Sequence, residues 1–190
     1  MTAAIALGRS DSTGVDDADG ELRLVEAAKS DAAALGRLYR RYEPVIAVFV
    51  LRRIGNRHEA EDIIANVFLQ MVRRLGRYER REAPFRAWLY RIATNEVNRW
   101  FRRRRLRRFW GKVPDVAAPG GSGGDEAERV RAALETLPAR FQNVISLRYL
   151  EGLSVEEISV VLACSPGTVK SRLDRGRERL RRALVGKRSD

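Results

Sequence analysis

The sequence predicts an all-α fold made of two small helical domains joined by a flexible linker. Apolar residues recur every three or four positions through most of the chain, without strand-like alternation. A run rich in glycine and proline, residues 111–124, separates two such blocks. We therefore expect a disordered acidic tail over residues 1–20, helical domains over 21–110 and 125–185, and the linker between them.

The charge and residue usage exclude several classes of protein. The net charge of +12 favours a polyanionic partner, either nucleic acid or an anionic membrane surface. A single cysteine, Cys164, and a single histidine allow neither an intrachain disulfide nor a Cys/His metal cluster, so we expect no metal and no cofactor. No stretch approaches ~18 apolar residues, and the acidic N-terminal segment differs from a signal peptide. We expect a cytoplasmic protein that does not insert into the membrane.

The first two helices are expected to be short and interrupted. One begins near Leu22, and Ser30 or Asp31 can cap the next. Pro44 is expected to interrupt or restart this second helix, because a proline inside a helix removes a backbone hydrogen bond. Gly55 provides a stop signal.

The third helix, residues 58–75, has the clearest amphipathic pattern. Its apolar side chains are spaced by three and four residues and should form one buried stripe. The stripe comprises Ile63, Ile64, Val67, Phe68, Met71, Val72 and Leu75. Gly76 ends the helix, and a polar loop over 77–83 leads to Pro84, which suits a first helical turn.

The fourth helix is expected to run to about Arg108 with a strongly basic end. Seven of the ten residues from 99 to 108 are arginines. The aromatic residues on this helix include Trp88, Tyr90, Trp100 and Phe101. Aromatic rings beside arginines suit the binding of unstacked bases, with the cations on the phosphate backbone. Two plainer interpretations stay open: the rings belong to the core, and the arginines are solvated or make only nonspecific phosphate contacts.

The second block is expected to hold four helices, and its last two carry the strongest motif. The first helix of the block stops at Pro138, and the second stops at Gly152. Ser154 and Glu157 form a capping box at the start of the third. A short turn ends at Ser165, which can cap the final helix.

Residues 154–184 therefore predict a helix-turn-helix whose second helix is basic. The N-terminal part of such a helix enters the major groove, where Arg or Lys contacts with guanine discriminate by roughly 1–3 kcal/mol each. The residues in that part are Thr168, Lys170, Ser171, Arg172, Asp174 and Arg175. The alternative is an ordinary amphipathic hairpin with a solvated basic face. Gly176, in the middle of the helix, should cost roughly 1 kcal/mol.

The stretch GLSVEEISVVLACSPGTVKSRLDRGRERLRR, residues 152–182, resembles region 4 of extracytoplasmic-function sigma factors, part of the sigma-70 family. The resemblance implies that the six residues given above recognise the −35 promoter element. The chain departs from the family at Asp174, where an aromatic residue or histidine is frequent. It also departs at Gly176, where alanine is usual.

The preceding block resembles region 2 of the same family. Residues 60–68, AEDIIANVF, are similar to its polymerase-binding helix. The resemblance implies that Asp62, Asn66, Gln70 and Arg73 contact the β′ clamp, although a solvated helix face remains the alternative. The family usually has Gln and Glu where this chain has Ala65 and Asn66, which puts the strength of core binding in doubt.

Residues 85–100, FRAWLYRIATNEVNRW, are similar to the promoter-melting and −10-recognition helix of region 2. The resemblance implies that the loop over 77–84 captures a flipped base and that Asn95 lies near it, although Asn95 could equally cap a backbone group. The residues implied at the −10 element are Tyr78, Arg80, Arg81, Trp88, Arg91, Asn95, Asn98, Arg99, Arg102 and Arg103. Asn98 replaces a common aspartate.

Two motifs in this order imply a sigma factor, not an enzyme, that directs transcription initiation. Its implied partners are core RNA polymerase, through the β′ clamp and β flap, promoter DNA and a regulating anti-sigma factor, with no small-molecule substrate. A conventional repressor or activator is one alternative, but it leaves the first block without a role. An enzyme acting on nucleic acid is another, with Mg²⁺ held by the pairs at 61–62 or 156–157. A membrane-surface basic helix is the third.

Overall fold

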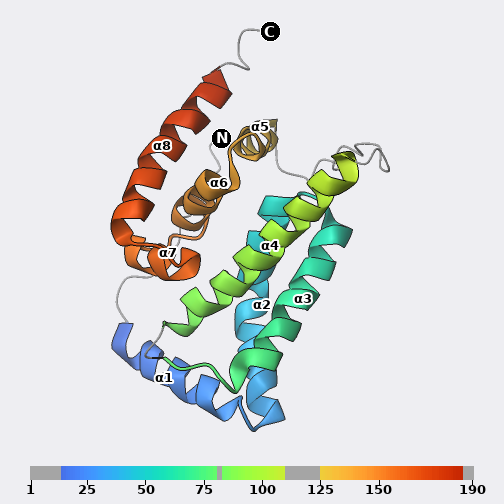
Figure 1. Cartoon of the computed structure of the whole chain (residues 1–190). Helices are drawn as coiled ribbons and strands as arrows, with labels where there is room; N and C mark the ends of the chain where they lie inside the picture. Colours follow the sequence, from blue (N-terminus) through green and yellow to red (C-terminus); the bar gives the residue numbers. More distant parts are fainter. Residues whose placement is uncertain (1–13, 81–82, 110–124, 186–190) are drawn as a thin grey trace, which may run out of the picture.

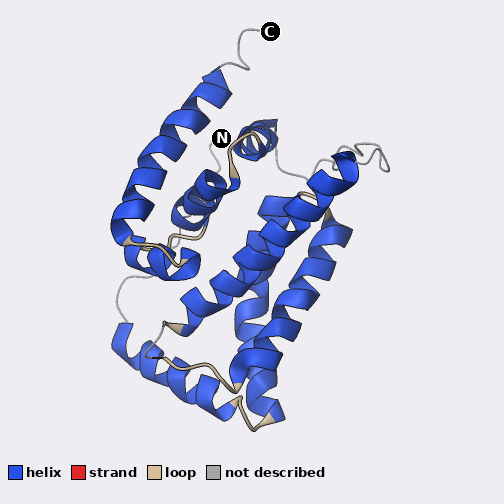
Figure 2. Cartoon of the chain, in the orientation of Figure 1, coloured by secondary structure: helices blue, strands red, loops and turns tan. Residues whose placement is uncertain are grey.

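The computed structural model describes residues 14–80, 83–109 and 125–185, and every regular element within these ranges is helical (Figure 2). The all-α prediction is confirmed, and the helices form an N-terminal group, α1–α4, and a C-terminal group, α5–α8 (Figure 1). The expected linker over 111–124 lies outside the described residues.

The N-terminal domain is a bundle of three long helices with a fourth helix at one end (Figure 1). Helices α2 (Ala32–Ile54), α3 (Arg57–Leu75) and α4 (Phe85–Phe109) pack side by side, and α1 (Gly14–Ala27) packs against α2. Asp31 caps α2 by accepting hydrogen bonds from the backbone N–H groups of Ala33 and Ala34.

Two expectations for this domain are wrong. Pro44 neither interrupts nor restarts α2, which continues through it, because packing against α1, α3 and α4 outweighs one lost backbone bond. Residues 14–20 are helical rather than disordered, and residues 1–13 lie outside the described part. The helix is held by Val25, which is fully buried, and by a hydrogen bond from the Tyr42 hydroxyl to Glu21.

The amphipathic stripe of α3 is confirmed except at one position. Six of its seven members are buried, but Val72 is 47% exposed, and the neighbouring Leu69 is 45% exposed. Val72 therefore lies beyond the edge of the stripe. Asn56 caps α3 through its side chain, and Gly55 ends α2 in the left-handed conformation with φ 73°. On α4, which follows Pro84 directly, Phe85, Leu89, Ile92 and Val97 are buried and Trp88 is half-buried.

The C-terminal domain consists of α5 (Asp125–Glu135), α6 (Ala139–Ile145), α7 (Val155–Leu162) and α8 (Pro166–Val185). The helix expected between Pro138 and Gly152 is present, but its second half, η1 (Ser146–Leu150), is a π-helical turn. The capping box at Ser154 and Glu157 is confirmed in both directions.

Two residues of the C-terminal domain are unusual, namely Ala163 in the turn of the helix-turn-helix and Gly176 inside α8. Ala163 ends α7 in the left-handed conformation, and the Ser165 hydroxyl then accepts the Thr168 backbone N–H at 3.2 Å. Gly176 is buried where α8 crosses α6, and a Cβ there would lie 3.1 Å from Cγ1 of Ile145. The glycine therefore permits the close approach of two helices, which offsets its low helix propensity.

Candidate nucleic-acid interface

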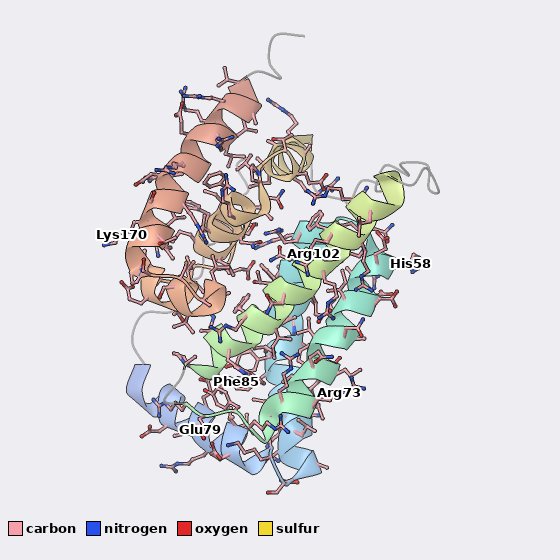
Figure 3. All side chains as sticks on the ribbon, in the orientation of Figure 1. His58, Arg73, Glu79, Phe85, Arg102 and Lys170 are labelled. Carbon is pink, nitrogen blue, oxygen red and sulfur yellow. The ribbon has the colours of Figure 1, made fainter. Side chains whose placement is uncertain are left out.

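The N-terminal part of α8 presents a polar, basic edge to solvent. Val169 and Leu173 are buried, and their packing fixes the rotation of the helix. Four of the predicted DNA-contacting residues are exposed, namely Lys170, Ser171, Asp174 and Arg175, whereas Thr168 and Arg172 are half-buried. Lys170 projects from the outer side of the helix (Figure 3). This edge has the exposure and charge that major-groove contact requires.

A second element contributes to this edge, and sequence reasoning missed it. Arg140 of α6 lines a shallow depression of about 450 Å³ together with Ser171, Arg172 and Arg175 of α8. Its guanidinium lies 4.9 Å from the centre of the Phe141 ring. Arg140 is distant in sequence from α8, so only the fold brings it to the predicted interface.

The later arginines of α8 are largely paired within the helix. Glu178 accepts hydrogen bonds from Arg181 and Arg182, which lower the pKa of its carboxyl to about 2. Asp174 forms an ion pair with Arg177. The basic face of α8 is therefore less positive than its arginines suggest, and Asp174, predicted to read a base, already has a partner.

The residues predicted to contact the −10 element fall into two groups. One group lies in a buried aromatic cluster around Tyr78, and the other lies on a more accessible side of α4 and the loop before it. Tyr78 is only 4% exposed, and its hydroxyl donates to the backbone oxygen of Ala83 at 2.8 Å. Burial, followed by the nearby Glu21 carboxylate, raises the pKa of Tyr78 to about 12. Its ring packs against Phe85 and Trp88. Tyr78 thus shapes the loop before α4 from inside. The labelled Glu79 and Phe85 mark the two ends of this segment in Figure 3.

The other members of that set lie along α4 or the preceding loop. Asn95, Arg102 and Arg103 are exposed, and Arg91 and Asn98 are half-buried. Arg99 pairs with Glu96 at 3.0 Å, and Arg80 lies 3.8 Å from Asp19. Arg81 lies outside the described residues.

The aromatic side chains of α4 belong mainly to the core. Tyr90 is 2% exposed and Trp100 is 7% exposed, so the core interpretation holds for both in this structure. Phe101 is half-buried, and its ring lies 4.8 Å from that of Trp100. Stacking on unpaired bases is therefore left to the half-buried Trp88 and Phe101.

The predicted polymerase-binding residues lie on the outer face of α3. Asp62, Asn66 and Arg73 are exposed and Gln70 is half-buried, and Arg73 points away from the bundle (Figure 3). The exposed apolar side chains of Leu69 and Val72 belong to the same stretch, which gives it the mixed composition of a protein-binding surface. Sequence reasoning did not assign Leu69 or Val72 to this surface. For Leu69 a signal was present, because its position falls outside the amphipathic stripe.

A groove connects this face with α4. Its volume is about 660 Å³, and its lining includes Asp62 and Asn66 of α3 and Trp100 and Arg103 of α4. Residues predicted to bind polymerase and residues predicted to bind DNA therefore share one depression. Among the described residues, no group of three or more His, Cys, Asp or Glu side chains could hold a metal ion. No helix in the described ranges combines the length and apolarity needed to cross a membrane.

A cavity of about 340 Å³ lies between the two domains. Arg91, Thr94, Asn95 and Asn98 of α4 line one side. The opposite side is formed by residues of α6, α7 and α8, among them Arg172. Side chains predicted to bind two separate promoter elements thus face one cavity.

Comparison with known protein families gives two matches in this order along the chain. The model described as "Sigma-70 region 2" matches residues 38–107, which cover most of α2 to α4. The model described as "Sigma-70, region 4" matches residues 127–180, which cover α5 to most of α8.

Several characterised proteins are similar over most of this chain. The ECF RNA polymerase sigma factor SigE of Mycolicibacterium smegmatis is 33% identical, over 83% of this chain and 65% of its own length. The RNA polymerase sigma-H factor of Pseudomonas aeruginosa is 32% identical, over 85% of this chain and 92% of its own. The ECF RNA polymerase sigma factor SigW of Bacillus subtilis is 30% identical, over 85% and 95%.

Two solved structures share the fold. CnrH, solved in complex with the cytosolic domain of CnrY, has a TM-score of 0.67 at 27% identity, over 87% of this chain and 96% of its own. RpoE of Bartonella quintana, solved with the anti-sigma factor NepR, has a TM-score of 0.65 at 24% identity, over 80% of this chain and 96% of its own.

Proposed function

The chain belongs to the extracytoplasmic-function sigma factors of the sigma-70 family, and we propose that it binds core RNA polymerase and directs transcription initiation at specific promoters. The observation that carries this proposal is the presence of regions 2 and 4, in that order, on two helical domains of one chain. A repressor that used the helix-turn-helix alone would have no use for region 2. The family consists of transcription initiation factors, and we propose that this member is likewise not an enzyme and works in the cytoplasm.

The C-terminal domain is proposed to recognise the −35 element through α8. Lys170, Ser171 and Arg175 are exposed at its N-terminal part, where a recognition helix meets base edges. Arg172 would join them once it is free of the interdomain cavity, and Thr168 would contact the backbone. Asp174 would accept from a cytosine amino group only after its ion pair with Arg177 opens.

The N-terminal domain is proposed to melt and read the −10 element through α4 and the loop before it. Arg102 and Arg103 are exposed and suit phosphate contacts. Asn95 and Trp88 are the side chains best placed near an extruded base, one by hydrogen bonding and the other by stacking. Tyr78 supports this loop from inside rather than touching DNA directly.

Core polymerase is proposed to bind the outer face of α3, through Asp62, Asn66 and Arg73 with Leu69 and Val72 beside them. Polar and apolar exposed side chains on one helix suit a protein partner better than a nucleic acid. The β flap is the proposed second contact, on the C-terminal domain. An anti-sigma protein is a further proposed partner, which fits the solved complex of the similar CnrH with the cytosolic domain of CnrY.

The test is binding of the full chain to bacterial core RNA polymerase, followed by transcription from a library of genomic promoter fragments. We expect a stable complex and a small set of new start sites that share −35 and −10 sequences. The double variant Leu69→Ser/Val72→Ser should lose the complex, whereas Val45→Ser, which changes an exposed apolar residue of α2, should keep it. Sequence-specific DNA binding without any association with polymerase would contradict the proposal.

A further inference from the structure

The cavity between the two domains is lined by arginines and by no carboxylate. Arg91 of α4, Arg140 of α6 and Arg172 of α8 all contribute to its wall, and its volume is about 340 Å³. No acidic residue is among its described lining residues, and none of these three arginines forms an ion pair within the described part of the chain. Positive charges gathered around one small space repel one another, so the cavity favours an anion.

The three guanidinium groups retain donors for such an anion. Arg172 makes one long hydrogen bond, from Nη1 to Sγ of Cys164 at 3.7 Å. The Arg140 guanidinium lies 4.9 Å from the centre of the Phe141 ring, a contact that uses its charge rather than its N–H groups. Guanidinium forks match the oxygens of phosphate. A phosphomonoester, with a charge of about −1.5 to −2 at pH 7, balances three arginines better than one carboxylate does.

Two buried oxygens show that an anion alone would not complete the cavity. Thr94 is 2% exposed, and its Oγ1 has no hydrogen-bond partner among the described residues. Oδ1 of the neighbouring Asn98 is likewise buried without a partner within the described ranges. Both residues line the cavity, one helical turn apart on the same face of α4. Buried polar groups are costly to leave unpaired, so these oxygens favour a ligand with hydroxyl or amino donors.

The end of α7 adds an apolar wall. Val161, Leu162 and Ala163 line the cavity beside the arginines, and Val161 is only 4% exposed. Sites for small molecules combine apolar walls with a few polar groups and have volumes of about 300–1,000 Å³. A peptide helix, about 10 Å across, is too wide for this cavity. The occupant is therefore a small molecule with an apolar face, hydrogen-bond donors and a phosphate.

We propose that this cavity binds a nucleoside monophosphate. The phosphate contacts the three arginines, the hydroxyl or amino groups donate to Thr94 and Asn98, and the base lies against the end of α7. Inorganic phosphate lacks the apolar face, and a nucleoside lacks the charge, so neither uses the whole site. Residues from both domains take part, because α4 runs past α6 and α7 where the domains meet (Figure 1).

A bound nucleotide would use side chains that the proposed function assigns to DNA. Asn95 and Arg172 line the cavity and also belong to the proposed −10 and −35 contacts, respectively. A nucleotide and promoter DNA would therefore compete for the same groups. The site itself stands on the contacts described above, whereas this competition rests on the proposed function.

The first measurement needs neither polymerase nor DNA. Isothermal titration of the full chain compares AMP and UMP, a purine and a pyrimidine nucleotide, with inorganic phosphate and with adenosine and uridine. We expect saturable binding of one nucleotide per chain for AMP, UMP or both, at least about tenfold tighter than binding of phosphate or of either nucleoside. Binding of neither nucleotide, or equal affinity for the nucleotide and inorganic phosphate, would overturn the proposal.

Two arginine variants test whether both walls of the cavity hold the phosphate. Arg91→Met and Arg140→Met lie on different domains, and each should weaken nucleotide binding by about tenfold or more. Arg37→Met is the matched control and should bind as the parent does, since Arg37 is 56% exposed and does not line the cavity. A loss in only one of the two cavity variants would place the phosphate on a single domain and contradict the site. Circular dichroism checks that each variant retains its helices.

Two variants of α4 separate a binding role from a structural one. Thr94→Val keeps the shape of the side chain and should weaken nucleotide binding severalfold. The melting temperature of the free chain should stay unchanged or rise, because the lost hydroxyl had no partner. Asn98→Asp places a carboxylate among the arginines and should weaken binding by about tenfold or more. A lower melting temperature for Thr94→Val without a change in affinity would assign Thr94 a structural role and count against the site.

The second measurement tests the competition with DNA. A mobility shift follows the promoter complex of the chain with core polymerase while the tighter-binding nucleotide is added. The nucleotide should weaken complex formation by the parent severalfold more than by Thr94→Val, a comparison that removes any action of the nucleotide on polymerase itself. Equal weakening in the two chains would overturn the competition. A chain that forms no promoter complex would contradict the proposed function, while the titration would still decide whether the site exists.

Discussion

The two basic helices, α4 and α8, differ in how their functional faces are presented. On α8 most of the predicted DNA-contacting side chains are exposed, and two buried residues behind them set the rotation of the helix. On α4 Arg91, Thr94 and Asn98 line the cavity that the other domain covers. Two helices with similarly basic sequences therefore differ in how much of their predicted DNA-contacting surface is open to solvent. Most of the predicted contacts on α8 are open to solvent, whereas the part of α4 around Thr94 and Asn98 faces the other domain.

The largest difference in stability between the two domains is expected when a glycine inside a helix is replaced. Gly176→Val should destabilise the C-terminal domain by about 2 kcal/mol, because a Cβ there would lie 3.1 Å from Ile145 and forces repacking. The matched change Gly36→Ala in α2 should stabilise the N-terminal domain by up to ~1 kcal/mol, since a Cβ there meets only the flexible Arg40 side chain at 3.6 Å. Urea unfolding followed by circular dichroism measures both. Equal effects of the same sign would contradict the close packing of α8 on α6.

The position of the DNA-contacting surface on α8 can be tested by comparing the effects of replacing two of its arginines. Arg175→Ala should weaken promoter-directed transcription by about ten- to hundredfold, as expected for a base or tight phosphate contact worth 1–3 kcal/mol. Arg181→Ala should change it much less, because Arg181 is paired with Glu178 and lies nearer the C-terminal end of the helix. Run-off transcription with core polymerase gives both values. A larger loss for Arg181→Ala than for Arg175→Ala would move the DNA-contacting face along the helix.

Removal of a helix cap should have a smaller effect than removal of these contacts. Ser154→Ala removes the cap of α7 and should cost about 1 kcal/mol of C-terminal domain stability. Asp31→Ala removes the corresponding cap of α2 and should cost a similar amount in the N-terminal domain. Thermal unfolding of each variant provides the measurement. A loss confined to one of the two would show that capping matters differently in the two domains.

The smallest expected effect is a pH dependence of stability through Glu151, which contacts Tyr90 and Arg52 across the domain interface. Burial raises the pKa of its carboxyl in the folded chain, against the opposing influence of Tyr90, Arg52 and Arg86. Since the folded chain then binds a proton more tightly than the unfolded chain, the contribution of Glu151 to stability should grow as the pH falls through the raised pKa. The change should level off below the ordinary glutamate pKa and be absent at higher pH.

Urea unfolding of the parent and of Glu151→Gln between pH 7.5 and about 4.5 measures this dependence as the difference between the two profiles. Glu151→Gln should flatten the profile, because the uncharged amide cannot titrate yet can still accept from the Tyr90 hydroxyl. An unchanged profile in Glu151→Gln would assign the effect to another group.

Local sequence signals predicted the elements, and long-range packing decided the rest. The capping box at Ser154, the stop at Gly55 and the stripe of α3 depend on neighbours within a few residues, so the sequence alone was enough. The continuity of α2 through Pro44 could not be predicted from proline's local effect, because it depends on three other helices. The same holds for Arg140, which only the fold brings to the predicted DNA-contacting edge of α8.

The hydrogen bonds of the buried Arg53 to Gln142, Asn143 and Ser146 lay furthest from sequence reasoning. Its partners are separated from it by 89 to 93 residues, and nothing in the local pattern distinguishes Arg53 from the many other arginines of the chain. The base-reading assignments along α4 and α8 stay predictions for the opposite reason. Whether these side chains contact bases depends on the geometry of a complex with DNA, which the fold of the free chain does not determine.

The pairing of Glu178 with Arg181 and Arg182, and of Asp174 with Arg177, has a consequence for how the recognition helix responds to ionic strength. Each phosphate neutralised by a free cation releases about 0.9 of a condensed counterion from duplex DNA. An arginine that must first leave a carboxylate on its own helix brings that negative charge to the DNA as well. Binding of this domain to DNA should therefore decline less steeply with added salt than its number of arginines suggests.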